Sequence, residues 1–471
     1  ATSILLAGLA PALWLVFAVF VTRELEPRRA LGAVARLGVL SLAVSLWWMA
    51  GLWAEGVYGI NVLKFTETLP TVTSTSLSSE VIRGLGYWYF YGQDKVQPWT
   101  SASIDYTQSA WLILVSFAVP TACLALGAFA RWRYRAFAIA LVLLGVTVAV
   151  AAYPFDNPSP VGKLLKATGS DSTIGLAMRS SNRVVPIAIL GLALLLGSGI
   201  SALISANRRV GLGVFAVAIA LVAADLPPLW TGNLVADNLA RPSVLPGYVT
   251  SAARYLNTRG GDTRVLQVPG EDFAYLRWGV TADPVWPGLL KRPYLVRQAV
   301  PAGEPASVNL LQALDESIQD GVFVPATLAP IAQLFSAGDI LDESDLQYER
   351  FDSARPQPFW LTLNSPQTPG LGKPVSFGTP KPVTSIRYPL QDETQLAIPT
   401  GAPLPPPVAV FPVKNPRPIV RTETTSHPLV IAGDGQGVVN AAAAGLLGSD
   451  PTIFYSASYA HDQRGFDKLM D

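Results

Sequence analysis

The sequence predicts a polytopic α-helical membrane bundle, followed by an α/β domain and a proline-rich, β-sandwich-like region. Of the 471 residues, 50% are hydrophobic and only 14% are charged, and the mean hydropathy is +0.35, a composition too apolar for an ordinary soluble protein of this length. The apolar residues gather into long runs before Leu226, and the composition changes after Leu226-Pro227-Pro228. We therefore expect the first half of the chain to lie in lipid and the second half to fold outside it.

Six runs in the first half have the length that a bilayer demands, roughly 20 apolar residues for a helix. Pro11 and Pro120 should kink two of these helices, which a bundle tolerates, and Pro186 should sit near a helix start, where its missing N–H costs little. Helices buried in a large soluble core are the alternative, but these rarely stay apolar on every side over successive runs. The predicted spans are about 1–21, 31–53, 110–130, 136–152, 184–205 and 210–226.

Arginines cluster in three alternate connections between these runs and predict the orientation of the bundle. Cationic loops stay on the cytoplasmic side of a membrane. The outer loops are then 54–109 and 153–183, and everything after Leu226 is extracytoplasmic in a multi-pass protein of the plasma membrane. The first span would run inward, so we expect a piece of a longer protein with an odd number of earlier spans. The arginines are Arg23, Arg28, Arg29, Arg36, Arg131, Arg133, Arg135, Arg208 and Arg209.

Charge and rare residue types exclude several kinds of site. The formal net charge of +1 gives no basic field for nucleic acid. Cys123 is the one cysteine and stands in an apolar run, so it reads as a small buried hydrophobe and no intramolecular disulfide is possible. The two histidines, His427 and His461, lie in separate segments, which leaves a zinc site of the usual spacing without ligands. No cofactor is predicted, although a carboxylate-bound divalent cation remains possible.

The first outer loop contains the stretch most suggestive of a binding site. Thr73–Asp94 reads TSTSLSSEVIRGLGYWYFYGQD, with one carboxylate three residues from one guanidinium and then five consecutive aromatic residues. At helical spacing the two charges share a face, which could hold a sugar beside flat rings. The alternative is an interfacial aromatic belt with a solvated ion pair. The candidate sugar-binding residues are Glu80, Arg83, Tyr87, Trp88, Tyr89 and Asp94, and Asp225 is a further spare carboxylate.

The second outer loop contains a pair of arginines, Arg179 and Arg183, just before the fifth span. Four residues apart, they would share one helical face at the membrane surface. Cations in that position could bind a lipid phosphate through charge-assisted hydrogen bonds. The alternative is simple snorkelling of both side chains at a helix end.

The second half of the chain reads as two regions after the membrane domain (1–228). The first, 229–352, is expected to be α/β, with a strand at Arg264–Pro269, a helix at Leu310–Ile318 and a helix leading into a strand over Ile331–Leu346. The second, 353–471, contains seventeen prolines from Pro356 to Pro428, a density that is expected to exclude helix and to permit only short or edge strands joined by turns. A β-sandwich-like module and a proline-rich linker wrapping the α/β domain are both compatible with it.

A glycine-rich turn near the end of the chain, PLVIAGDGQG, superficially suggests a dinucleotide site. The fingerprint needs a third glycine that this sequence lacks. We prefer a tight turn at Asp434-Gly435 that leads into a helix.

Seven long and unusual strings of the chain resemble one protein family. They are SLSSEVIRGLGYWYFYG (76–92), AMRSSNRVVP (177–186), VLQVPGEDFAYLRWG (265–279), RPYLVRQAVPAGEPASVNLLQALD (292–315), SDLQYERF (344–351), PPPVAVFPV (405–413) and PLVIAGDGQG (428–437). They are similar to the actinobacterial, mycobacterial-type α-(1→3)-arabinofuranosyltransferase D family. The resemblance implies a GT-C type membrane glycosyltransferase that takes arabinofuranose from a decaprenyl-phosphate carrier. It also implies α-(1→3) branching of the arabinan in arabinogalactan and lipoarabinomannan.

This resemblance implies partners but assigns no catalytic residue. The family's proposed catalytic acid lies in its first outer loop, near the family's N-terminus and outside this chain. The implied partners are a decaprenyl-phosphate-linked arabinose donor, an arabinan acceptor and membrane lipid, while a cytoplasmic-face partner stays unassigned. The alternative is a non-enzymatic, membrane-anchored glycan-binding scaffold or a transporter subunit. A transporter should carry charges in mid-span, and none of the six runs has one at its centre, which counts against transport but not against an anchor.

Overall fold

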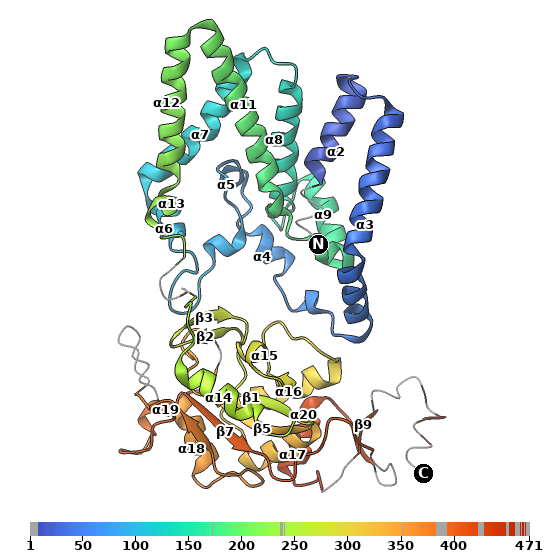
Figure 1. Cartoon of the computed structure of the whole chain (residues 1–471), viewed down its shortest axis with the longest axis vertical. Coiled ribbons are helices and arrows are strands. Elements are labelled where there is room, and N and C mark those ends of the chain that lie inside the picture. Colours follow the sequence, from blue (N-terminus) through green and yellow to red (C-terminus); the bar gives the residue numbers. More distant parts are fainter. Residues whose placement is uncertain are drawn as a thin grey trace. The chain divides into compact units, whose positions relative to one another are not determined.

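The computed structural model divides the chain into two compact units (Figure 1). The helical unit comprises Ala1–Ala54 and Leu63–Asp237, and the α/β unit comprises Glu55–Val62 and Asn238–Asp471. The described residues are 8–171, 173–235, 239, 241–351, 353–382, 393–422, 428–448, 452–456, 462, 464–465 and 467.

Each predicted apolar run forms a helix in the helical unit. The helices are α2 (Leu9–Val16) with its π-helical extension η1 (Phe17–Val21), α3 (Pro27–Tyr58), α7 (Ala110–Phe129), α8 (Arg135–Val150), α11 (Val185–Ala206) and α12 (Arg208–Asp225). The first seven residues of the first predicted span lie outside the described residues. Pro186 stands in the first turn of α11, as expected, and Pro120 lies inside α7.

Three of these helical segments are long and apolar enough to cross a membrane: Pro27–Tyr58, Ala110–Phe129 and Ser181–Ala206. The apolar helices Leu9–Val21 and Arg135–Val150 are shorter. Charged residues stand at both ends of α12, which begins with Arg208 and Arg209 and ends with Asp225. Helices with the length and apolarity of membrane spans are therefore confirmed for three segments, and the full set of six spans stays a prediction.

Small residues allow the central helices of the bundle to approach closely. A β-carbon at Gly145 of α8 would lie 2.6 Å from the backbone nitrogen of Ala188 in α11. A β-carbon at Gly191 of α11 would lie 2.6 Å from the carbonyl oxygen of Ala138 in α8. Close backbone approach at small residues is typical of helix packing in membranes, where van der Waals contact replaces the hydrophobic effect as the driving force.

The connections that were expected to be outer loops are folded into short helical turns. The first contains η2 (Val62–Lys64), α4 (Leu69–Thr73), α5 (Ser78–Ile82), η3 (Trp88–Tyr91) and α6 (Ala102–Gln108). The second contains α9 (Pro160–Asp171), α10 (Thr173–Met178) and η4 (Ser181–Val184), and α13 (Pro227–Thr231) follows α12. The candidate site residues lie almost entirely on these turns.

A mixed five-stranded sheet forms the centre of the α/β unit, whose α/β character the sequence predicts. Its strands lie in the order β4 (Tyr294–Leu295), β1 (Arg264–Val268), β5 (Ala337–Glu343), β7 (Val408–Pro412) and β6 (Val375–Phe377). The first three are parallel, and β7 runs antiparallel to both β5 and β6. Leu266 pairs with Ile340 and Leu341 pairs with Val410, which sets the register.

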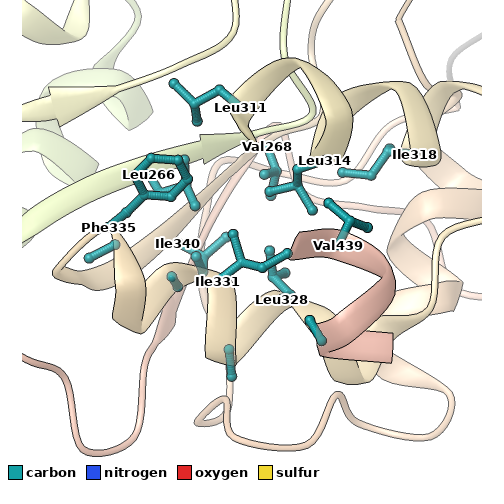
Figure 2. Packing of buried hydrophobic residues seen from close by; sticks show 14 of the residues in the cluster. Leu266, Val268, Leu311, Leu314, Ile318, Leu328, Ile331, Phe335, Ile340 and Val439 are labelled. Atoms are coloured by element: carbon teal, nitrogen blue, oxygen red, sulfur yellow. The ribbon is translucent and has the colours of Figure 1, made fainter. Parts of the chain in front are cut away.

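Helices cover both faces of this sheet because its strands alternate between two apolar faces. One face packs against α14 (Gly247–Asn257) and α15 (Trp286–Leu289). The other packs against α16 (Pro305–Gln319), α17 (Leu328–Leu334), α18 (Pro356–Asn364) and α20 (Gly435–Ala443), and the short turn η6 (Pro325–Thr327) precedes α17. Figure 2 shows the core of that second face, where Leu266, Leu314, Ile331 and Ile340 point toward one another. The remaining elements are α19 (Glu393–Leu396), the antiparallel pair β2 (Ala274–Leu276) and β3 (Gly279–Ala282), and the parallel pair β8 (Leu429–Ile431) and β9 (Ile453–Tyr455).

The proline-rich region is not a separate β-sandwich in the described residues. Its strands β6 and β7 join the central sheet through β5, and its first segment is the helix α18. The expectation that proline excludes helix was wrong here because Pro356 and Pro358 both stand in the first turn of α18, where backbone N–H groups have no partner within the helix. The predicted boundary at 353 therefore falls inside one folded unit.

The glycine-rich turn near the end of the chain is structural, as preferred above. Asp434 caps α20, and its carboxylate accepts a hydrogen bond from the Gln436 N–H at 3.1 Å. A β-carbon at Gly435 would lie 2.6 Å from the carbonyl oxygen of Asn309 in α16. Close packing of two helices therefore explains this glycine.

A fully buried carboxyl group stands on β5. Asp342 has no exposed surface, and Ser344 Oγ donates to its two oxygens at 3.2 and 3.3 Å. Burial, with a smaller contribution from the charge of Asp345, raises the pKa of Asp342 from 3.8 to about 8, although the hydrogen bond from Ser344 lowers it. The folded unit therefore holds a proton at neutral pH that the unfolded chain has released.

The stability of the α/β unit should consequently fall as the pH rises from about 4 to about 8, through the pKa of Asp342. One such carboxyl group changes the free energy of unfolding by at most about 1.4 kcal/mol per pH unit. Asp342→Asn cannot ionise and should flatten this dependence, whereas Asp320→Asn on the surface should not. Hydrogen exchange of peptides from β5, corrected for the intrinsic rate, measures the effect, and an unchanged slope in Asp342→Asn would contradict it.

Candidate functional site

The guanidinium of Arg83, at the end of α5, is buried and bonded on three sides. Its side chain is only 3% exposed. Nη1 donates to Glu80 Oε1 at 2.7 Å, Nε to Ser116 Oγ at 2.7 Å and Nη2 to the carbonyl oxygen of Tyr106 at 2.8 Å. The ring of Phe117 lies 5.0 Å from the guanidinium carbon. Arg83 thus joins α5, α6 and α7.

Glu80 is held by two donors, so its charge is fully paired. Arg83 binds Oε1, and the Tyr91 hydroxyl donates to Oε2 at 2.6 Å. Burial raises the pKa of Tyr91, and its hydrogen bond to Glu80 raises it further. The predicted pairing of Glu80 with Arg83 forms, but the alternative of a solvated ion pair was wrong because the loop folds over the guanidinium.

The rings of Tyr87, Trp88 and Tyr89 cluster with Trp99, a residue that the sequence analysis missed. Trp99 lies 5.1 Å from Tyr89 and 6.1 Å from Trp88 between ring centroids. The side chain of Tyr89 is open to solvent at 44% exposure. The indole N–H groups of Trp88 and Trp99 are buried and have no hydrogen-bond partner among the described residues. The cluster therefore offers one open ring to a ligand, while its two unpaired indole donors are buried.

Asp94 closes the turn that places Trp99 in this cluster. Its Oδ1 accepts hydrogen bonds from the N–H groups of Val96 at 2.7 Å and Gln97 at 2.9 Å. The Trp99 N–H then donates to the carbonyl oxygen of Gly92 at 3.0 Å. A β-carbon at Gly92 would overlap the Trp99 ring, so glycine is needed there. One oxygen of Asp94 thus supports the site indirectly, through the position of Trp99.

Arg179 lies inside the protein. Its side chain is 3% exposed, and Nη1 donates to the carbonyl oxygens of Leu63 at 3.1 Å and Leu176 at 3.0 Å. Nη2 donates to Thr66 Oγ1 and lies 3.8 Å from Glu67 Oε2. Nε is buried and has no hydrogen-bond partner among the described residues. Arg179 therefore ties the second connection to the first.

Arg183 differs from Arg179 because its side chain is exposed. It makes no side-chain hydrogen bond or ion pair with the residues that the structure describes. The expectation that both arginines share one helical face was wrong, because α10 ends at Met178 and the chain passes into the tight turn η4 before α11 begins. Only Arg183 keeps donors that an external anion could reach.

Asn182 completes the link between the two connections. Its Nδ2 donates to the carbonyl oxygens of Gly86 at 2.7 Å and Val72 at 3.3 Å, and to Ser76 Oγ. The side chain is buried, at 2% exposure for the residue. It thereby fixes the backbone immediately before the aromatic cluster.

Asp225, the last residue of α12, lies beside the Arg83 network. Its carbonyl oxygen accepts a hydrogen bond from the Tyr106 hydroxyl, whose pKa burial raises to about 12. Its carboxylate Oδ1 is buried and unbonded among the described residues. Of the spare carboxylates named from the sequence, Asp225 thus has an oxygen available to a ligand or proton.

No group of three or more His, Cys, Asp or Glu side chains in the described part of the chain is placed to hold a metal ion. His427 and His461 lie outside that part. The carboxylate-bound cation allowed by the sequence therefore stays a prediction.

The network around Arg83 should be essential for the fold of the helical unit. Arg83→Met removes the charged partner of Glu80, whose side chain is 19% exposed and keeps only the Tyr91 hydroxyl as a donor. Removing one partner of a largely buried ion pair typically lowers the free energy of unfolding by about 3–5 kcal/mol. The double variant Glu80→Gln with Arg83→Met should recover part of that loss. Unfolding of the purified chain by detergent titration measures these effects.

The matched control is Arg133→Met, because Arg133 pairs with Glu24 on the surface at 57% and 27% exposure. This substitution should lower the free energy of unfolding by no more than about 1 kcal/mol. Equal losses in Arg83→Met and Arg133→Met would show that burial does not set the strength of the pair.

The chain is similar to curated proteins from two mycobacterial species, and both of these proteins have the same name. Both are named alpha-(1->3)-arabinofuranosyltransferase: that of Mycobacterium tuberculosis is 29% identical over 363 residues, and that of Mycolicibacterium smegmatis is 28% identical over 357 residues. These alignments cover 73% and 72% of the chain but only 25% and 24% of the relatives. The chain thus spans about a quarter of the length of these relatives.

Solved structures show the same fold. The cryo-electron microscopy structure of arabinofuranosyltransferase AftD from Mycobacteria matches with a TM-score of 0.64 at 21% identity, over 98% of this chain and 30% of that one. A mutant form of it, class 2, matches with a TM-score of 0.64 at 19% identity, over 98% and 31%. The family profile described as alpha-(1->3)-arabinofuranosyltransferase, N-terminal GT-C domain, matches residues 1–469. Because that match covers nearly the whole chain, the chain belongs to the α-(1→3)-arabinofuranosyltransferase family and matches its N-terminal GT-C domain.

Proposed function

We propose that the protein is a membrane glycosyltransferase that transfers arabinofuranose from decaprenyl-phospho-arabinofuranose to the arabinan of arabinogalactan and lipoarabinomannan, forming α-(1→3) branches. Family membership over residues 1–469 is the observation that carries this proposal. The names of the mycobacterial relatives support the sugar and the linkage.

Such a transfer needs three kinds of group: a carboxylate to take a proton from the acceptor hydroxyl, a cation to stabilise the departing phosphate, and flat rings to hold the sugar. Arg183 is our candidate for the phosphate contact because its N–H donors make no hydrogen bond to the described residues. Those of Arg179 Nη1 and Nη2 donate to protein groups. Tyr89 is the candidate ring, supported by Trp88 and Trp99. The catalytic base is left unassigned.

We also propose a multi-pass arrangement in the plasma membrane with six spans in this chain. The arginines between alternate apolar helices support a cytoplasmic location for those turns. The connections that contain the aromatic cluster, and the α/β unit, would then both be extracytoplasmic. A donor with a polyprenyl tail lies in the membrane, so its phosphate would meet the protein near the outer ends of the helices.

The transfer proposal is tested with the protein in native membranes, labelled decaprenyl-phospho-arabinofuranose and an arabinan acceptor. Arg183→Ala should raise the Michaelis constant for the donor roughly tenfold to a hundredfold, since a lost charge-assisted contact costs about 1.5–3 kcal/mol. The constant for the acceptor should hardly change. Arg183→Lys should recover part of the loss, because lysine keeps the charge but not the planar fork.

Arg208→Ala is the matched control, since Arg208 is an exposed arginine at the other end of α11. If Arg183→Ala changed the Michaelis constants for donor and acceptor equally, or changed neither, Arg183 would not be part of the phosphate site. Arabinan binding by the wild-type protein without any transfer would favour a glycan-binding scaffold over an enzyme.

The proposed orientation predicts which introduced cysteines react with an impermeant reagent from outside the cell. Cysteines at Ser78 and Val420 should react, and one at Phe129 should not. All three positions are exposed, and the native Cys123 is buried. Reaction at Phe129 alone would reverse the assignment of sides.

A further inference from the structure

One hydrogen bond joins the two halves of the proposed donor site. Asn182 immediately precedes Arg183, the candidate for the phosphate contact, and Gly86 immediately precedes the run of aromatic residues that begins at Tyr87. Asn182 Nδ2 donates to the carbonyl oxygen of Gly86 at 2.7 Å. Consecutive Cα atoms lie only about 3.8 Å apart, so this bond holds the backbone of Arg183 close to that of Tyr87.

Asn182 makes this link inside the protein, where water does not compete for it. The residue is only 2% exposed, and its other two hydrogen bonds also reach the first connection. Val184, the residue after Arg183, has no exposed surface and packs in one apolar cluster with Val81 of α5. Contacts on both sides of Arg183 therefore hold η4 against the first connection.

Both backbone polar groups of Gly86 are held in place. Its N–H donates to the Tyr91 hydroxyl at 3.3 Å, and that hydroxyl donates to Glu80. Its carbonyl oxygen accepts a second hydrogen bond, from Thr75 Oγ1 at 3.1 Å. The φ angle of Gly86 is +93°, in the left-handed region that favours glycine. A shift of Asn182 would therefore move a well-defined turn together with the rings that follow it.

The chemistry of the donor makes the separation of the two halves important. In a glycosyl phosphate a single oxygen atom joins the phosphorus atom to the anomeric carbon of the sugar. A cation and an aromatic ring can bind both parts of one molecule only if their separation fits that short link. Free polyprenyl phosphate, which the transfer leaves behind, has no sugar and uses the cation alone. The separation therefore affects binding of the donor but not of this product.

We propose that Asn182 is a positioning residue, which sets the separation between the Arg183 guanidinium and the ring of Tyr89 so that the sugar and the phosphate of one donor bind together. The proposal rests on the function proposed above and adds to it a structural basis for preferring the donor over free polyprenyl phosphate. Asn182 contacts neither part of the donor and acts through the backbone of its neighbours.

Binding of decaprenyl-phospho-arabinofuranose and of decaprenyl phosphate to the full chain in lipid nanodiscs tests the proposal. Asn182→Leu keeps a similar size without the donor group and should weaken binding of the sugar-bearing lipid about tenfold, the effect of losing a hydrogen bond to a buried group. Binding of decaprenyl phosphate should change less than about twofold, because Arg183 is retained. Tyr89→Ala should weaken donor binding in the wild-type background and have little further effect in Asn182→Leu, where the ring no longer reaches the sugar.

Ser103→Ala is the matched control, since Ser103 is also buried and its hydroxyl donates within its own turn, to the carbonyl oxygen of Thr100 at 2.7 Å. It should leave the preference for the donor unchanged. Thr75→Val removes the other side-chain donor to Gly86 and should lower the preference in the same direction as Asn182→Leu. If Asn182→Leu does not fold, an unchanged preference in Thr75→Val overturns the proposal.

Loss of donor binding alone in Asn182→Leu, with Ser103→Ala unchanged, supports the proposal. Equal weakening of both lipids in Asn182→Leu would mean that Asn182 only maintains the fold, and unchanged binding of both would mean that its hydrogen bond is not needed. Either result overturns the positioning role while the wild-type protein still binds the donor. A wild-type protein that binds neither lipid overturns the proposed function itself, and the positioning role with it.

Discussion

The fold of the candidate site depends on the buried guanidinium of Arg83. A charged group that is buried must be paired and hydrogen-bonded, because otherwise the free-energy cost of removing it from water exceeds the free energy gained by packing. Arg83 meets this demand by contacting a carboxylate, a hydroxyl and a carbonyl group on different helical segments. Each of these contacts fixes the position of a turn. The aromatic cluster follows from the same network, because Tyr91 holds the second oxygen of Glu80.

Buried polar side chains act in the same way across the whole helical unit. Arg179 and Asn182 reach from the second connection to backbone groups of the first, at Leu63, Val72 and Gly86. Apolar packing alone would leave these turns poorly defined, since it has no preferred direction. Hydrogen bonds to specific carbonyl groups give the two connections one arrangement. Two segments that look like separate loops in the sequence therefore form one structure.

The α/β unit is organised differently. Apolar side chains point alternately to the two faces of its sheet, so helices pack on both faces. A buried ion pair still fixes one end of that sheet, where Arg292 and Arg259 both bind Asp339 at 2.6 Å. At the other end, buried acidic groups and the proline-rich segment together enclose a cavity. The proline-rich segment is thus part of the sheet, because its strand β7 pairs with β5 and its strand β6 pairs with β7. Prolines of the same segment line the cavity.

The sequence by itself determined the positions of the apolar helices, the α/β pattern of the second half and the family. These features depend on local composition, on periodicity and on long distinctive strings, and each can be read without knowing what a residue contacts. It also predicted the pairing of Glu80 with Arg83, which is a contact across a single helical turn. It did not predict that Arg179 is buried while Arg183 is exposed, that Trp99 joins the aromatic cluster, or that the proline-rich strands complete the sheet. Burial and partnership between distant segments decided these points, and they arise only when the chain is folded, because the groups that desolvate and pair a side chain lie many residues away from it.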